Sequence, residues 1–225
     1  MLKIFLLLFI TSIALINANL EDAVNGFFEQ RCSKGGNPNA YSELLSASIR
    51  VKICVENNVP SSVNEAETFK AICTESYDNI YKCVEDLLEK FEPCLEPEEK
   101  YLPDFVLGSF NNTLDEQCKD SGKFFLEQRA NLKHANCSVA SGTITPMILE
   151  TCAPKLKLIE ALKKTDFVLR QDELCSDIET MKNCFLDVFE ERCENDTYTQ
   201  YIETFFSPVL DWCTEQRTNN KLGEN

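Results

Sequence analysis

Histidine is almost absent from this sequence, and the common catalytic motifs are missing. The one histidine, His134, lies in the polar segment "ANLKHANC". No G-x-S-x-G serine, H-E-x-x-H zinc pair or glycine-rich phosphate loop accompanies it. We therefore expect no catalytic residue, no cofactor and no metal ligand, and we predict that the chain is not an enzyme.

Glycine is also scarce, with 7 residues in 225, and no segment alternates cleanly between apolar and polar residues. A β-sandwich needs many tight turns and strands of period two, so both deficits argue against that fold. After the first eighteen residues, no run approaches the ~20 apolar residues that a membrane-spanning helix needs.

Basic residues are few, because 22 Lys and Arg stand against 37 Asp and Glu, which gives a formal net charge of −15. Binding to nucleic acid needs clustered cations, and docking on anionic lipid needs a basic surface. We therefore expect no nucleic-acid partner and no membrane partner. The acidity favours a solvated surface.

The first residues read as a secretory leader. Lys3 precedes the apolar run "IFLLLFITSIALI", and the segment breaks at "NAN". Such a run is short for a membrane span and typical of a signal peptide. We predict a signal peptide over residues 1–18, cleavage after Ala18, and a secreted, extracellular mature chain.

Cysteine is the abundant exception. An even number of cysteines in an exported chain predicts six disulfides. Zinc sites favour close pairs such as C-x2-C, and no two cysteines here are that close, so we expect the cysteines to form disulfides and to bind no metal. The twelve cysteines are Cys32, Cys54, Cys73, Cys83, Cys94, Cys118, Cys137, Cys152, Cys175, Cys184, Cys193 and Cys213.

Apolar residues recur with helical spacing in the segment "YDNIYKCVEDLLEKFEPC". Ile80, Cys83, Val84, Leu87 and Leu88 form one stripe of period 3.6, and acids and lysines fill the other face. Several other segments show the same pattern. We predict an all-α fold, a disulfide-stapled helical bundle.

The later segment "IETMKNCFLDVFEERC" repeats this pattern. With Cys83 aligned on Cys184, apolar residues match apolar residues, and Asp86 and Glu89 match Asp187 and Glu190. Successive cysteines are separated by 21, 18, 9, 10 and 23 residues in the first six and by 14, 22, 8, 8 and 19 in the last six. We predict an internal duplication, with six-cysteine helical units at residues 19–135 and 136–225 packed together as one globular body.

Geometry favours particular pairings within each unit. Two cysteines ten positions apart in one straight helix lie too far apart to bridge. If the helices 74–91 and 97–118 are antiparallel neighbours, the end of the second returns to the start of the first. This arrangement favours Cys73–Cys118, and the repeat favours Cys175–Cys213; the other pairings stay open.

Three sequons, "NNT" at Asn111, "NCS" at Asn136 and "NDT" at Asn195, are candidate glycosylation sites. Fifteen phenylalanines are many for a chain of this length. They fit packing between helices, or alternatively the lining of an apolar pocket for a small hydrophobic ligand.

With this cysteine map, the chain resembles the insect 27 kDa haemolymph glycoprotein family. The most specific stretches are "TFKAICTESYDNIYKCVEDLLEKFEPCLEPEEK" and "DELCSDIETMKNCFLDVFEERC", and twelve cysteines follow the family's order. Outside these two stretches the similarity is lower, and little beyond the spacing is similar between Cys118 and Cys137 or in the other residues after Cys152. The resemblance implies a secreted glycoprotein of haemolymph or another body fluid, and it implies no established activity.

We therefore expect a secreted, non-enzymatic glycoprotein that serves binding, transport or defence in an extracellular fluid. One alternative is a carrier of a small hydrophobic ligand in a cavity lined by Phe and Leu. Another is a secreted effector or protease-inhibitor-like protein with an extracellular protein partner. The sequence leaves the oligomeric state open.

Overall fold

The computed structural model describes residues 18–34, 37–59, 65–123, 126–127, 130, 148, 150–161, 164, 167–193 and 197–222. These residues form helices and connecting turns with no β-strand among them, which confirms the all-α prediction. None of the helices in these ranges combines the length and the hydropathy of a membrane-spanning segment. Residues 1–17 of the predicted leader lie outside them.

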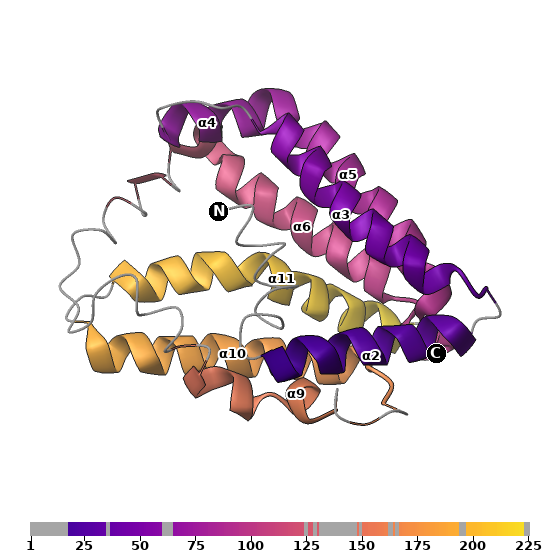
Figure 1. Ribbon diagram of the computed structural model, residues 1–225. Helices are drawn as coiled ribbons and strands as arrows, with labels where there is room; N and C mark the ends of the chain where they lie inside the picture. Colours follow the sequence, from indigo (N-terminus) through magenta and orange to yellow (C-terminus); the bar gives the residue numbers. More distant parts are fainter. Residues whose placement is uncertain are drawn as a thin grey trace.

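The helices before residue 123 lie in one layer in Figure 1, except for α2, which lies outside that layer. They are α2 (Ala18–Lys34), α3 (Ala40–Asn58), α4 (Glu65–Ala71), the π-helical turn η1 (Ile72–Ser76), α5 (Tyr77–Phe91), η2 (Glu92–Cys94), η3 (Pro97–Glu99), α6 (Leu102–Cys118) and η4 (Lys119–Gly122). In Figure 1, α3, α5 and α6 lie side by side with a common slant.

The later helices lie below that layer in Figure 1, on the same side as α2. They are η5 (Ala153–Lys155), α9 (Lys157–Ala161), α10 (Gln171–Arg192) and α11 (Thr197–Leu222). Helix α11 packs against both α10 and α6, so it connects the two groups of helices.

Local chemistry explains where α6 and the turn before it begin. The Glu99 carboxylate accepts a hydrogen bond from the Glu96 backbone N–H at 3.0 Å, which is half of a capping box around η3. Pro97 opens η3, and Pro103 lies in the first turn of α6. Proline is favourable there because its missing N–H would have no helical partner.

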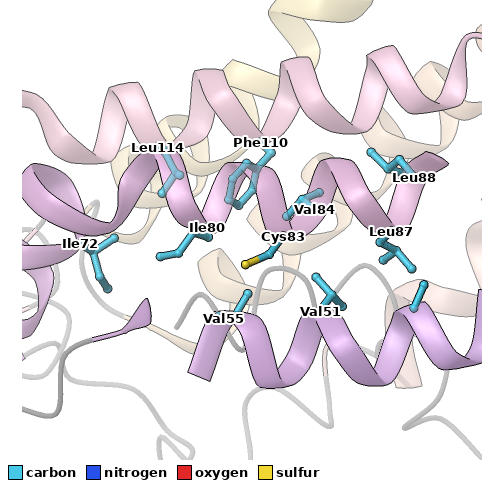
Figure 2. Packing of buried hydrophobic residues seen from close by; sticks show 11 residues of the cluster. Val51, Val55, Ile72, Ile80, Cys83, Val84, Leu87, Leu88, Phe110 and Leu114 are labelled. Carbon is cyan, nitrogen blue, oxygen red and sulfur yellow. The ribbon is translucent and has the colours of Figure 1, made fainter. Parts of the chain in front are cut away.

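The first core cluster forms where α3, α5 and α6 meet, and it uses the apolar stripe predicted for α5. Figure 2 shows Val51 and Val55 of α3 pointing toward α5, with Phe110 and Leu114 of α6 on the other side. Ile80 at the centre has no exposed surface. Burying each such side chain stabilises the fold by about 1.5–3 kcal/mol.

A second core cluster joins residues from the two predicted units. Leu102 and Phe105 of α6 are buried together with residues of α10 and α11, including Trp212. The ring of Phe105 meets the indole of Trp212 edge-on at 4.9 Å. The two groups of helices therefore share this second cluster.

The two matching sequence segments form α5 and α10 and have corresponding buried faces. Cys83 and Cys184 are both buried, and Asp86 and Asp187 are both exposed. The agreement shows that these matching positions of the two segments are buried or exposed alike. The duplication itself stays a prediction.

Candidate functional site

Five disulfides connect the described helices. They are Cys32–Cys94, Cys54–Cys83, Cys73–Cys118, Cys152–Cys184 and Cys175–Cys213. The two pairings that helix geometry favoured, Cys73–Cys118 and Cys175–Cys213, are among them. Cys193 is also disulfide-bonded, and Cys137 lies outside the described residues.

The described pairings follow one order in both halves of the chain. Counted within each set of six, the second cysteine pairs with the fourth in Cys54–Cys83 and in Cys152–Cys184. The third pairs with the sixth in Cys73–Cys118 and in Cys175–Cys213. No pair among these five crosses from one predicted unit to the other.

The Cys73–Cys118 disulfide is partly exposed at both of its cysteines. It is the only described pair in which neither cysteine is fully buried. Cys73 lies in the π-helical turn η1, and Cys118 is the last residue of α6. Accessibility is one of the factors that set how fast a thiolate attacks a disulfide.

A polar surface depression lies beside this disulfide. Its volume is about 300 Å³, and it is lined by Cys73, Thr74, Glu75, Tyr77, Asp78 and Asp115. Residues from η1, the start of α5 and the end of α6 therefore meet around it. A single π-helical turn within a longer helix often marks a functional site, which makes this depression the candidate site of the described chain.

Asn111, the only candidate glycosylation residue within the described ranges, adjoins this depression. Its Oδ1 accepts a hydrogen bond from the Tyr77 hydroxyl, and its Nδ2 donates to Asp115 Oδ2 at 3.1 Å. The Tyr77 hydroxyl also lies 3.2 Å from Asp115 Oδ1. These contacts orient the Asn111 amide toward two residues that line the depression.

The chemistry of the depression is hydrogen bonding. Partial burial, and then the nearby Asp115 carboxylate, raise the pKa of Tyr77 well above its usual value, so its hydroxyl stays protonated and donates. Glu75, Asp78 and Asp115 contribute carboxylate acceptors. In the described part of the chain, no group of three or more His, Cys, Asp and Glu side chains is arranged to hold a metal ion.

The remaining predicted site residues do not gather here. Asn136 and Asn195 lie outside the described residues, as does His134. Thr113, the hydroxyl residue of the Asn111 sequon, is 4% exposed, and its Oγ1 has no hydrogen-bond partner. The sequon thus lies in the middle of α6 with its amide at the surface and its threonine in the interior.

Sequence reasoning missed a buried ion pair. Arg31 of α2 donates to both carboxylate oxygens of Glu99, at 2.9 and 3.2 Å, and their side chains are 2% and 5% exposed. Glu99 also accepts from the backbone N–H of Leu169 at 2.8 Å, and Arg31 donates to the carbonyl of Phe167. The pair therefore ties α2, η3 and the segment before α10 together. No local pattern signals a contact between residues 68 positions apart.

Sequence reasoning also missed an exposed apolar stripe on α3. Leu45, Ile49 and Ile53 are 42%, 62% and 51% exposed. Their spacing of four residues puts them on one face, opposite the buried Val51 and Val55. The signal was present in the sequence, because α3 has apolar residues on two faces.

Comparison with known proteins gives a family and no activity. A family model described as "Protein of unknown function (DUF1397)" matches residues 17–213, which is most of the chain. Neither the curated proteins nor the solved structures include a match to this chain. The match reaches from the start of α2 to Cys213, the last cysteine of the network. The chain therefore belongs to the family of proteins of unknown function DUF1397.

Proposed function

We propose that this chain is a secreted, non-enzymatic glycoprotein of the haemolymph type that acts by binding, as a transport or defence protein in an extracellular fluid. The site offers hydrogen-bonding groups at a surface and a rigid scaffold behind them. Both suit recognition of another molecule.

The observation that carries the proposal is the cysteine network. Ten of the twelve cysteines form the five described pairs, and Cys193 is bonded as well. Disulfides form and persist in oxidising compartments and are rare in the cytosol. Each can stabilise the fold by about 2–4 kcal/mol, which favours persistence outside the cell.

Packing supports surface binding over carriage of a ligand in an apolar cavity. Many of the described phenylalanines contact other aromatic rings, including Phe185 with Phe206 at 5.4 Å and Phe189 with Tyr198 at 4.5 Å. Rings that pack on one another at these distances fill the space between helices. The depression beside Cys73, in contrast, is lined by polar side chains.

Expression of the full chain with its own leader in insect cells tests the proposal. We expect the protein in the medium, beginning at Asn19, with no free thiol under denaturing conditions. Retention inside the cells, or free thiols in the purified protein, would contradict it.

Native mass spectrometry of the secreted protein separates the two forms of binding. After glycan removal, a bare polypeptide mass supports binding at the surface. An additional discrete mass that disappears on organic extraction would overturn that form in favour of a carrier of a small hydrophobic molecule.

A further inference from the structure

We infer that Asn111 carries an N-linked glycan whose first sugar occupies the depression beside Tyr77 and shields the Cys73–Cys118 disulfide from thiols. This inference rests on the proposed function only in requiring that the chain enter the secretory pathway.

The covalent step is the usual transfer to an asparagine amide. A lipid diphosphate-linked oligosaccharide of the secretory pathway is the donor. A bond forms between the anomeric carbon of the first sugar and Asn111 Nδ2, and the bond from that carbon to the diphosphate oxygen breaks. The lipid diphosphate leaves, and one Nδ2 proton is released. Nδ2 keeps its second hydrogen, so the amide still has one N–H to donate to Asp115.

The amide of Asn111 is already oriented for such an attachment. The Tyr77 hydroxyl donates a hydrogen bond to Oδ1, and Nδ2 donates one to Asp115 at 3.1 Å. Both Tyr77 and Asp115 line the depression. A sugar on Nδ2 therefore starts next to the depression. The attachment fixes its position without the entropy cost that a free sugar would incur on binding.

The depression has the size and the chemistry for a sugar. Its volume of about 300 Å³ falls at the lower end of the range for small-molecule sites. Carboxylates of Glu75, Asp78 and Asp115 accept hydrogen bonds from sugar hydroxyls, and the Tyr77 ring supplies an aromatic surface. A neutral sugar satisfies these acceptors with its hydroxyl donors.

A sugar in this position would cover the accessible disulfide, because Cys73 itself lines the depression. The other four described pairs each have at least one cysteine buried by the protein. Cys73–Cys118 lacks that cover, and the sugar would supply it by restricting the approach of a thiolate.

The burial of Thr113 also indicates whether the glycan is transferred before or after folding. Thr113, which the transferring enzyme must recognise as part of the sequon, is 4% exposed in α6. Transfer must therefore precede packing of α6 against its neighbours. Folded, unglycosylated chain is expected to be a poor acceptor.

Two substitutions at Thr113 test the inference without disturbing Asn111. Thr113→Val removes the sequon while keeping the shape of the side chain, and the lost hydroxyl has no hydrogen-bond partner. Thr113→Ser keeps the sequon and serves as the matched control. If Thr113→Val is not secreted, an amidase that removes the whole glycan, including its first sugar, from the native wild-type protein and leaves an aspartate at position 111 provides a second comparison.

The first readout is the peptide that contains Asn111, analysed by mass spectrometry of protein secreted from insect cells. We expect glycan on the wild type and on Thr113→Ser, and none on Thr113→Val. An unmodified Asn111 in secreted wild-type protein overturns this inference and leaves the proposed function standing. Failure of the wild type to be secreted overturns the proposed function instead.

The second readout is the rate at which dithiothreitol reduces each disulfide of the folded protein, followed by alkylation and peptide mapping. Without the glycan, Cys73–Cys118 should be reduced roughly three- to tenfold faster because access controls the rate. Cys54–Cys83, which does not line the depression, should be unchanged. Equal rates for Cys73–Cys118 with and without the glycan would reject the shielding.

Discussion

Gly108 of α6 lies directly against the indole of Trp212 on α11. A Cβ atom at Gly108 would be 2.9 Å from Trp212 Cδ1 and 3.1 Å from Nε1. Real Cβ atoms essentially never approach another heavy atom closer than 3.0 Å, so any side chain here must displace the indole. This close approach lets α6 and α11 share one core.

Gly108→Ala should therefore lower the free energy of unfolding by about 1–3 kcal/mol, the usual cost of overpacking a core. Denaturant titration with the disulfides intact measures the change. Gly26→Ala is the control, because a Cβ on Gly26 would meet nothing within 4 Å. That substitution in α2 should stabilise by about 0.5–1 kcal/mol. Equal effects of the two substitutions would disprove the steric argument.

Glu99→Gln should destabilise the protein by about 3–5 kcal/mol, because it removes the buried charged partner of the Arg31 guanidinium and leaves only the partly exposed carboxylate of Glu96, at 3.3 Å. Glu92→Gln is the control, because it makes the same chemical change in a different ion pair. Glu92 pairs with Lys100 at 3.6 Å, but both side chains are about half exposed. Its loss should cost less than about 1 kcal/mol. Urea titration of the two variants and the wild type gives the comparison, and a small effect at Glu99 would refute the importance of the pair.

Alkaline pH should weaken the fold through Tyr77 and Tyr101. Burial, followed by nearby carboxylates, raises the pKa of both hydroxyls well above the unfolded value of 10.0. The folded state then holds protons that the unfolded state releases, so this stability is fully present below pH 10 and decreases as the pH rises above it. Spectrophotometric titration should show that Tyr77→Phe removes one late-ionising tyrosine. Ionisation of all tyrosines together near their ordinary pKa would contradict the prediction.

The sixth disulfide should join Cys137 to Cys193. In the first half, Cys32–Cys94 joins the first and fifth cysteines of the set, and the other two pairings recur in the second half. The corresponding first and fifth cysteines of the second half are Cys137 and Cys193. Non-reducing peptide mapping checks this pairing, and a Cys193 linked to any other cysteine would break the proposed repeat.

The helical class and part of the disulfide framework could be predicted because they depend on local spacing. The stripe through Ile80, Cys83 and Val84 follows from 3.6 residues per turn, and it put the cysteine on the buried face. Antiparallel packing of neighbouring helices then favoured Cys73–Cys118 and Cys175–Cys213, which the structure contains.

Some residues of the candidate site could also be predicted from the sequence. The sequon at Asn111 and the cysteines were predicted from motifs. Their position beside Tyr77 and Asp115 was not, because the approach of α5 to α6 brings Tyr77 within hydrogen-bonding distance of a residue 34 positions away. The partial exposure of Cys73 and Cys118 likewise depends on what packs around η1.

The sequence by itself determined the helices, their buried faces and the abundance of disulfides. A helix and its buried face follow from the spacing of apolar residues along the chain, and the number of disulfides follows from the number of cysteines in an oxidising compartment. Only the tertiary structure decided that Arg31 meets Glu99, that Gly108 admits Trp212, and that Leu102 and Phe105 complete the core of α10 and α11. Such contacts depend on how the surfaces of whole helices pack against one another. The same sequence pattern of apolar and polar residues is compatible with many different pairings of amphipathic helices.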